Sequence, residues 1–132
     1  MKKQKVYIER ELKSNSKGII WKLISSAEGL QRWVADSVTE DGKQITFKWG
    51  DDCTCHAMHT ATVLEKVKFR RFRFKWDGSE DPEEYVELKL EKSEITDDFM
   101  LCITDFAEPG ETDSIISLWH GDLDRLHRSS GL

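Results

Sequence analysis

Hydrophobic and polar residues follow two different periods along this chain. Near the N-terminus, Val6, Ile8 and Leu12 share one face of an alternating segment, and Arg10 lies between them on that face. This pattern predicts a half-buried strand over residues 6–12. A period of two returns over residues 38–106, so we expect most of the chain to form β-structure.

Between these two β-regions the spacing of apolar residues changes to that of a helix. Ile20, Leu23 and Ile24 lie three and four residues apart, as one face of a helix requires. The polar residues 14–16 offer side-chain oxygens that can cap the start of this helix. A second short helix is predicted over residues 28–33.

The long β-region divides into alternating runs that turn residues separate. The runs cover residues 45–49, 60–65, 72–76, 86–91 and 99–104. Each run has one apolar and one mostly polar face, which is typical of an antiparallel sheet covered on one side only. We therefore expect a curved antiparallel sheet of about six to seven strands.

The last part of the chain predicts one long helix, from Thr112 to Leu126. Ile116, Trp119, Leu123 and Leu126 follow at spacings of three, four and three, so they form one apolar face. Thr112 or the neighbouring residue 113, an aspartate, is expected to cap this helix. Its apolar face has to be buried against the inner face of the sheet, which predicts an α+β fold.

Composition narrows the possible functions. The 132 residues carry a formal net charge of −5, and this acidic balance argues against a nucleic-acid-binding protein. No apolar run approaches the roughly 20 residues that cross a bilayer, so we expect a cytoplasmic protein without a membrane span. The three cysteines suggest no disulfide framework.

Short motifs spread along the chain resemble the START-like (SRPBCC, or helix-grip) superfamily, and most of all its proteins similar to the activator of Hsp90 ATPase. The motifs are Ile20-Trp21-Lys22-Leu23-Ile24, Glu28-Gly29-Leu30-Gln31-Arg32-Trp33, Phe72-Arg73-Phe74-Lys75-Trp76 and the apolar face of the last helix. The resemblance implies a single domain over residues 1–132, with a long C-terminal helix held by a curved sheet and two short helices after the first strand. It also implies an apolar cavity between helix and sheet.

Members of this superfamily range from lipid carriers to cyclases and co-chaperones, so the resemblance implies no single activity. We expect a domain that binds a small hydrophobic or lipid-like molecule in the cavity, without catalysis and without a cofactor. The alternatives are a protein-interaction module, which would have a protein partner, and a cyclase-like enzyme. The expected ligand contacts are Trp33, Phe47, Trp49, Phe72, Phe74, Trp76, Leu88, Leu101, Ile103, Ile116, Trp119, His120 and Leu123.

Each of these candidates also has a structural interpretation. The aromatic residues can fill a solid core instead of lining a cavity, and His120 can be a solvated side chain. Gly121 costs about 1 kcal/mol inside a helix relative to alanine, which indicates either a close approach to the helix or an exposed position. Arg10 is the best candidate for an ionisable group inside a cavity, and its alternative is an edge position paired with an acid.

A cluster of Cys53, Cys55, His56 and His59 contains residues that zinc prefers as ligands. In an extended segment Cys53, Cys55 and His59 share one face, but the spacing fits no established zinc motif, so we expect a loop without metal.

Other polar residues allow weaker hypotheses. The carboxylates of Asp36, Asp41, Asp105 and Glu108 are candidates for proton transfer only if the fold aligns them. The outward residues 71, 73 and 75, two arginines and a lysine, can meet an acidic partner or pair with acids of the next strand.

Overall fold

A single sheet and three helices make up the computed structural model, which describes residues 3–50, 57–79 and 81–132. The strands are β1 (Gln4–Glu11), β2 (Ser37–Asp41), β3 (Gln44–Trp49), β4 (Ala57–Val67), β5 (Arg71–Trp76), β6 (Val86–Lys92) and β7 (Phe99–Ala107). The helices are α1 (Lys17–Ser25), α2 (Ala27–Leu30) and α3 (Thr112–Ser130). The predicted α+β helix-grip fold is confirmed.

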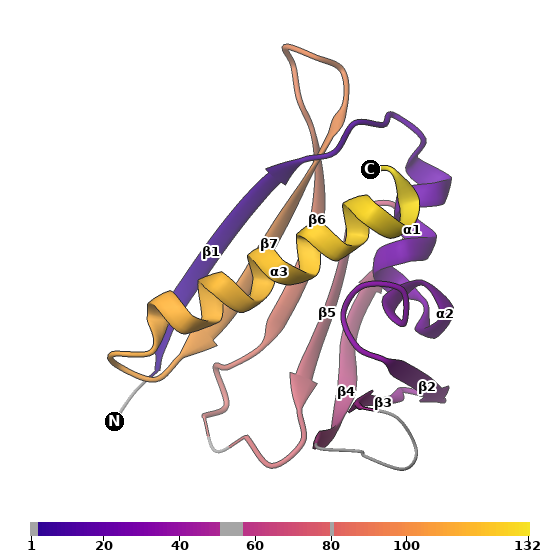
Figure 1. Cartoon of the computed structure of the whole chain (residues 1–132). Coiled ribbons are helices and arrows are strands. Elements are labelled where there is room, and N and C mark those ends of the chain that lie inside the picture. The colour runs from indigo at the N-terminus through magenta and orange to yellow at the C-terminus, as the bar shows by residue number, and fades with distance from the viewer. Residues whose placement is uncertain (1–2, 51–56, 80) are drawn as a thin grey trace.

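All seven strands pair antiparallel in the order β1-β7-β6-β5-β4-β3-β2. Consecutive strands from β2 to β7 are neighbours, whereas β1 lies at the opposite edge from β2 and pairs with the last strand, Gln4 opposite Ala107. In Figure 1 the sheet curves around α3, which lies diagonally across its concave face. Among the described residues, no helix combines the length and the apolar character needed to span a bilayer.

Helix α3 packs on the sheet through the apolar face that the sequence predicts. Trp119, Leu123 and Leu126 are buried, while Ile116 at the margin is only partly buried. The predicted cap was wrong. The N-cap position is Glu111, and the side chain of Glu111 makes no capping hydrogen bond. The Thr112 hydroxyl instead donates to the side chain of Gln4, 3.1 Å away on β1.

Helix α3 ends at Ser130, beyond the predicted Leu126, and Gly131 follows it as the C-cap. Gly131 adopts a left-handed conformation, with φ of 79°, and its amide donates to the carbonyl of His127. A glycine suits this position because it has no side chain to clash.

Helices α1 and α2 meet at a very tight contact. A Cβ atom on Gly29 of α2 would lie 2.0 Å from the backbone oxygen of Lys22, so only glycine fits there. The Trp33 indole donates to the carbonyl of Leu23, 2.8 Å away, which satisfies a backbone group left free at the end of α1. The glycine and tryptophan of the recognised motif therefore serve packing.

The ends of these two helices differ in part from the prediction. Ser16 is the N-cap of α1 but forms no side-chain cap bond, whereas Ser26 accepts from the amide of Gly29 and caps α2. Helix α2 ends at Leu30, before the predicted residue 33, because the chain turns there to bring Trp33 under α1.

Two irregularities shape the hairpin of β4 and β5. The register shifts between Val63 and Glu65, so Leu64 bulges outward and is half exposed. In the turn, Phe69 has a φ of 67°, a region that bulky side chains rarely adopt. The Phe69 ring packs edge-on against Trp21, with 6.4 Å between ring centroids, and this contact compensates for part of the backbone strain.

Candidate functional site

The structure gathers most of the predicted ligand contacts into one packed core. Nine of them are buried: Trp33, Phe47, Phe72, Phe74, Leu88, Leu101, Ile103, Trp119 and Leu123. Trp49, Trp76 and Ile116 are partly buried against the same core, and His120 is exposed. The predicted set thus divides into an inner group and a smaller group at the margin.

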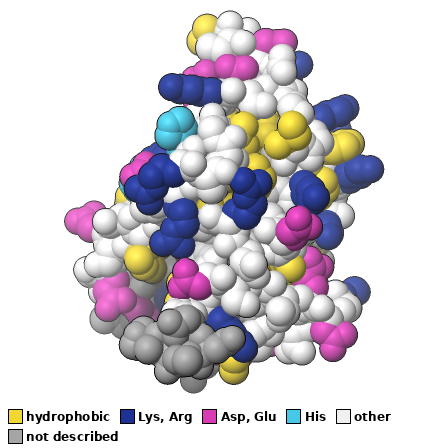
Figure 2. All heavy atoms as spheres, turned by 45° about the vertical axis from the view of Figure 1, so that its right-hand side comes forward, with side chains coloured by type: hydrophobic (Ala, Val, Ile, Leu, Met, Phe, Trp, Pro, Cys, Tyr) yellow, Lys and Arg dark blue, Asp and Glu magenta, His cyan; other side chains and the backbone are white. Residues whose placement is uncertain are grey.

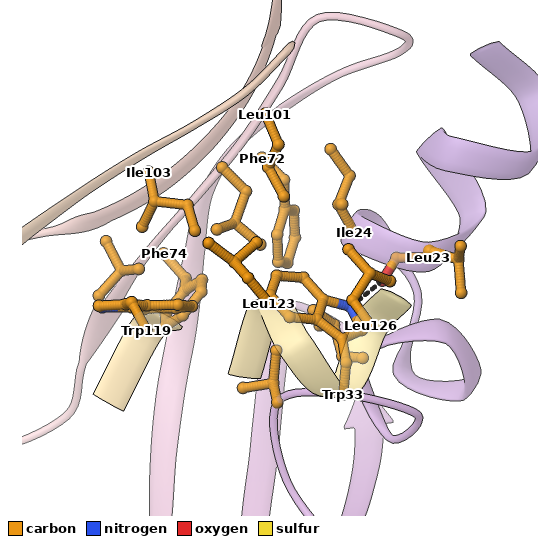
Figure 3. Packing of buried hydrophobic residues seen from close by; sticks show 14 of the residues in the cluster. Leu23, Ile24, Trp33, Phe72, Phe74, Leu101, Ile103, Trp119, Leu123 and Leu126 are labelled. Carbon is orange, nitrogen blue, oxygen red and sulfur yellow. Dashed lines mark hydrogen bonds between the residues drawn. The ribbon is translucent and has the colours of Figure 1, made fainter. Parts of the chain in front are cut away.

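The inner group is held by contacts between its own rings. The Trp33 and Trp119 ring centroids are 6.2 Å apart, and those of Phe47 and Phe74 are 5.5 Å apart. Figure 3 shows Trp119 of α3, Phe74 of the sheet and Trp33 of the segment after α2 converging, with Trp33 bonded to the carbonyl of Leu23. This part of the concave face is closed by side-chain packing.

At the other end of the concave face, aromatic rings reach solvent. His59 lies 5.8 Å from both Trp49 and Trp76, measured between ring centroids, and the two tryptophans are 6.4 Å apart. His59 is exposed and both tryptophans are partly exposed. In Figure 1 the corresponding ends of β4 and β5 extend beyond α3. We call this cluster of Trp49, His59 and Trp76 the open aromatic end.

A partly buried carboxylate, that of Asp105, lies between α3 and the sheet. Asp105 accepts hydrogen bonds from the Trp119 indole, at 2.8 Å, and from the Phe106 amide, at 2.7 Å. Burial raises the pKa of the Asp105 carboxyl, and the negative charge of Glu84 raises it further, while the two hydrogen bonds oppose this shift. Asp105 therefore fastens α3 to β7 rather than facing bulk water.

Glu84 near Asp105 is a buried acid that the sequence analysis missed. Its carboxylate accepts from Lys3 at 2.8 Å and from the Ser79 hydroxyl at 2.8 Å. A signal was available, because Glu84 precedes Val86 by two residues and so continues the alternation of the apolar side of β6.

Arg10 joins the edge strand to the helix. Its guanidinium donates to the Asp124 carboxylate, at 2.9 Å, and contacts Nδ1 of His120 at 3.3 Å. This is the paired edge position that was the alternative to an ionisable group in a cavity. Gly121 is exposed, and outside the adjoining stretch of α3 no atom lies within 4 Å of where its Cβ would be. This agrees with an exposed position, which was the second explanation for a glycine inside this helix.

The possible metal ligands are described only in part. Cys53, Cys55 and His56 lie outside the described residues, and His59 packs against tryptophans. Within residues 3–50, 57–79 and 81–132, no three His, Cys, Asp or Glu side chains are grouped to hold a metal ion.

The basic outward face of β5 is largely neutralised by neighbouring acids. Arg71 pairs with Glu65 at 2.7 Å, and Arg73 pairs with Glu87 of β6. Pairing with acids across strands was one of the two expectations for this face. Both arginines follow it, Arg71 toward β4 and Arg73 toward β6, the next strand along the chain. Lys75 instead donates to the carbonyl of Asp81, 3.1 Å away.

Two surface hollows lie away from the predicted ligand contacts. A hollow of about 360 Å³ is lined by Val67, Arg70, Arg71, Lys89 and Leu90, beside the β4–β5 turn. An open groove of about 910 Å³ follows α3 and is lined by Asp113, Ser114, Ser117, Leu118, Gly121, Asp122, Arg125 and Arg128. In this groove, loss of hydration raises the pKa of the Asp122 carboxyl to about 7, against a lowering by Arg125.

Comparison with solved structures gives matches over nearly the whole chain. The solution structure of BfR322 from Bacteroides fragilis is 37% identical, with a TM-score of 0.64, over 97% of this chain and 91% of that one. The Aha1 dimer from Colwellia psychrerythraea is 15% identical, with a TM-score of 0.68, over 97% and 98%. CalU16 from Micromonospora echinospora is 16% identical, with a TM-score of 0.70, over 96% and 75%.

The last two likenesses concern the fold alone. No curated protein matches the chain. The model of the START-like superfamily domain matches residues 1–131. Because this match extends from the first strand to the end of α3, the chain belongs to the START-like superfamily.

Proposed function

We propose that this domain binds a small, mostly apolar molecule, which enters at the open aromatic end of the concave face. The observation that supports this most directly is the partial exposure of Trp49 and Trp76 where β3 and β5 extend past α3. Exposed tryptophan rings supply large flat apolar surfaces, and ligand pockets are commonly lined by them.

The inner residues of the predicted set form the wall that such a ligand would meet. Phe47 contacts both Trp49 and Trp76, at 6.0 and 5.2 Å between centroids, and Phe74 contacts Trp76 at 5.3 Å. A ligand on the two tryptophans would therefore continue the packed core outward.

Binding without catalysis agrees with how the ionisable groups are used. The Asp105 carboxylate accepts a hydrogen bond from the Trp119 indole, and the Arg10 guanidinium donates one to the Asp124 carboxylate. A group held in this way stabilises the fold, whereas a general acid or base needs access to the reacting molecule.

The test is a titration of the protein with fatty acids, sterols and flavonoids, with tryptophan fluorescence and melting temperature recorded for each. We expect at least one class to shift both signals saturably. The variant Trp76→Leu should lose most of this response. Tyr85→Leu is the matched control, because Tyr85 is also a partly buried aromatic but contacts Phe106 edge-on, on the other side of the sheet. No response from any class, or an unchanged response in Trp76→Leu, would contradict the proposal.

A second candidate is a protein-interaction module, and the groove along α3 favours it. Leu118 is 65% exposed there, and Asp113 lies at the N-terminal end of the helix while Arg125 and Arg128 lie near its C-terminal end. Two copies of α3 packed antiparallel would place acids opposite bases in both halves of a symmetric contact.

Sedimentation equilibrium tests this second candidate. We expect a reversible dimer that Leu118→Asp converts to a monomer, whereas Ile19→Asp, another exposed apolar residue on a different helix, leaves it intact. A wild-type protein that stays monomeric at the highest soluble concentration would exclude self-association through this face.

A further inference from the structure

The hollow beside the β4–β5 turn combines positive charge with a partly enclosed shape. Arg70, Arg71 and Lys89 line it, together with the apolar side chains of Val67 and Leu90. In a protein with a net charge of −5, three basic side chains around one hollow of about 360 Å³ are a local exception. The volume suits a small polyatomic anion together with part of an attached organic group.

Backbone hydrogen bonds fix the position of this hollow. The Arg70 amide donates to the Val67 carbonyl at 2.9 Å, which closes the turn. The Leu90 amide donates to the Arg70 carbonyl at 2.7 Å, which ties the turn to β6. Phe69 takes the left-handed conformation and packs on Trp21, so the turn is anchored on α1 as well.

The three basic groups differ in how far they are already neutralised. Arg71 is paired with Glu65 at 2.7 Å, and Lys89 with Glu91 at 3.0 Å. The guanidinium of Arg70 forms no hydrogen bond or ion pair with any residue that the structure describes, and Arg70 is exposed. A guanidinium that is free in this way keeps all its donors available for an incoming oxyanion.

The surface around the turn adds more positive charge. Lys17 and Lys68 lie over the Phe69 ring, 4.9 and 5.0 Å from its centroid, and neither is ion-paired within the described part of the chain. On the upper right of the face in Figure 2, basic side chains are interleaved with exposed apolar ones. Such a surface attracts anions toward the hollow.

We propose that the hollow formed by Val67, Arg70, Arg71, Lys89 and Leu90 binds an oxyanion, a phosphate or carboxylate group, with Arg70 as its principal contact. Arg71 and Lys89 share their charge between this group and their acidic neighbours. The anion belongs either to a free small molecule or to a lipid headgroup. The site lies at the start of β5, about 17 Å along the strand from Trp76 at its end, so it is independent of the open aromatic end.

Nuclear magnetic resonance of the 15N-labelled protein tests the site with inorganic phosphate as the probe, against chloride at equal ionic strength. We expect saturable shifts of the amides of residues 67–71 and 89–90 with phosphate alone. Arg70→Gln should weaken binding about tenfold, because it removes a charge-assisted contact. Lys43→Gln, which removes an exposed positive charge from the turn between β2 and β3, is the control and should bind as the wild type does.

Sedimentation with vesicles separates the two sources of the anion. Binding to phosphatidylglycerol vesicles but not to phosphatidylcholine vesicles, lost in Arg70→Gln, would assign the anion to a lipid headgroup. Saturable phosphate binding without sedimentation would assign it to a free molecule. Equal shifts with phosphate and chloride and no sedimentation, or Arg70→Gln binding as tightly as wild type in both assays, would overturn the proposal.

Discussion

Two helical regions of this protein each contain a glycine, and the two glycines have opposite surroundings. In the contact between α1 and α2, Gly29 has no space for even one added carbon atom. On the outer side of α3, Gly121 faces open space beside a groove, next to Asp122. Between α1 and α2, close packing allows only glycine at position 29. The outer side of α3 is not packed in this way, so it is available for contacts with other molecules.

The largest expected effect is in the tight contact. Gly29→Ala should lower the free energy of unfolding by about 3 kcal/mol, because the new methyl group collides with the backbone of α1, which cannot move aside as a flexible side chain would. Urea denaturation followed by circular dichroism measures this. A loss below about 1 kcal/mol would show that the two helices can separate slightly at little cost.

A second change in the same region removes a hydrogen bond with little change of shape. Trp33→Phe should cost about 2 kcal/mol, because it leaves the Leu23 carbonyl without its buried donor and leaves a small cavity. The same denaturation experiment measures this loss. Trp49→Phe is the comparison, since its indole also bonds to a backbone carbonyl, that of Val34, but is partly exposed. Trp49→Phe should cost less, and an equal cost would mean that burial does not distinguish the two sites.

On the open side of α3, a pH effect is expected. The pKa of Asp122 is about 7 in the folded protein and near 3.8 when unfolded, so the folded state holds the proton more tightly between these values. The free energy of unfolding should therefore fall as pH rises from about 4 to about 7. Asp122→Asn should remove this part of the pH dependence and raise stability at pH 8, by an amount of the order of 1 kcal/mol. Stability profiles of the two proteins that run parallel from pH 4 to pH 8 would contradict this.

The smallest effect is expected at the second glycine. Gly121→Ala should raise the free energy of unfolding by about 0.7 kcal/mol, because alanine favours helix and meets no neighbouring atom there. A thermal melt is sensitive enough to detect it. If Gly121→Ala were less stable than the wild type, the added methyl group would be colliding with a neighbour. The difference from Gly29 would then not hold.

The alternation of apolar residues was sufficient to predict most of the fold. Each predicted run of the sheet appears as a strand, and Trp119, Leu123 and Leu126 are buried on α3. These features follow from the spacing of apolar residues alone, because each strand and helix has to bury its apolar side.

The alternation of apolar and polar residues could not show which aromatic residues contact each other and which remain exposed. Phe47 and Trp49 alternate identically on β3, yet Phe47 is fully buried, whereas Trp49, the last residue of the strand, is partly exposed. The hollow at Arg70 depends on the positive φ of Phe69, and glycine or asparagine would have been the sequence signal for such a turn. Nor could the spacing show that the Thr112 hydroxyl would bond to Gln4, while the N-cap position falls on Glu111, whose side chain makes no capping bond.

The pairing of the first strand with the last has a consequence for synthesis. Val6 of β1 is opposite Asp105 of β7, so β1 has no sheet partner until about a hundred further residues have left the ribosome. At ordinary elongation rates this takes about 5 to 20 s, during which β2 to β6 can assemble as successive hairpins. Both the nascent edge of β6 and the apolar side of β1 are exposed over that interval, so this protein should depend on chaperones most strongly just before β7 is synthesised.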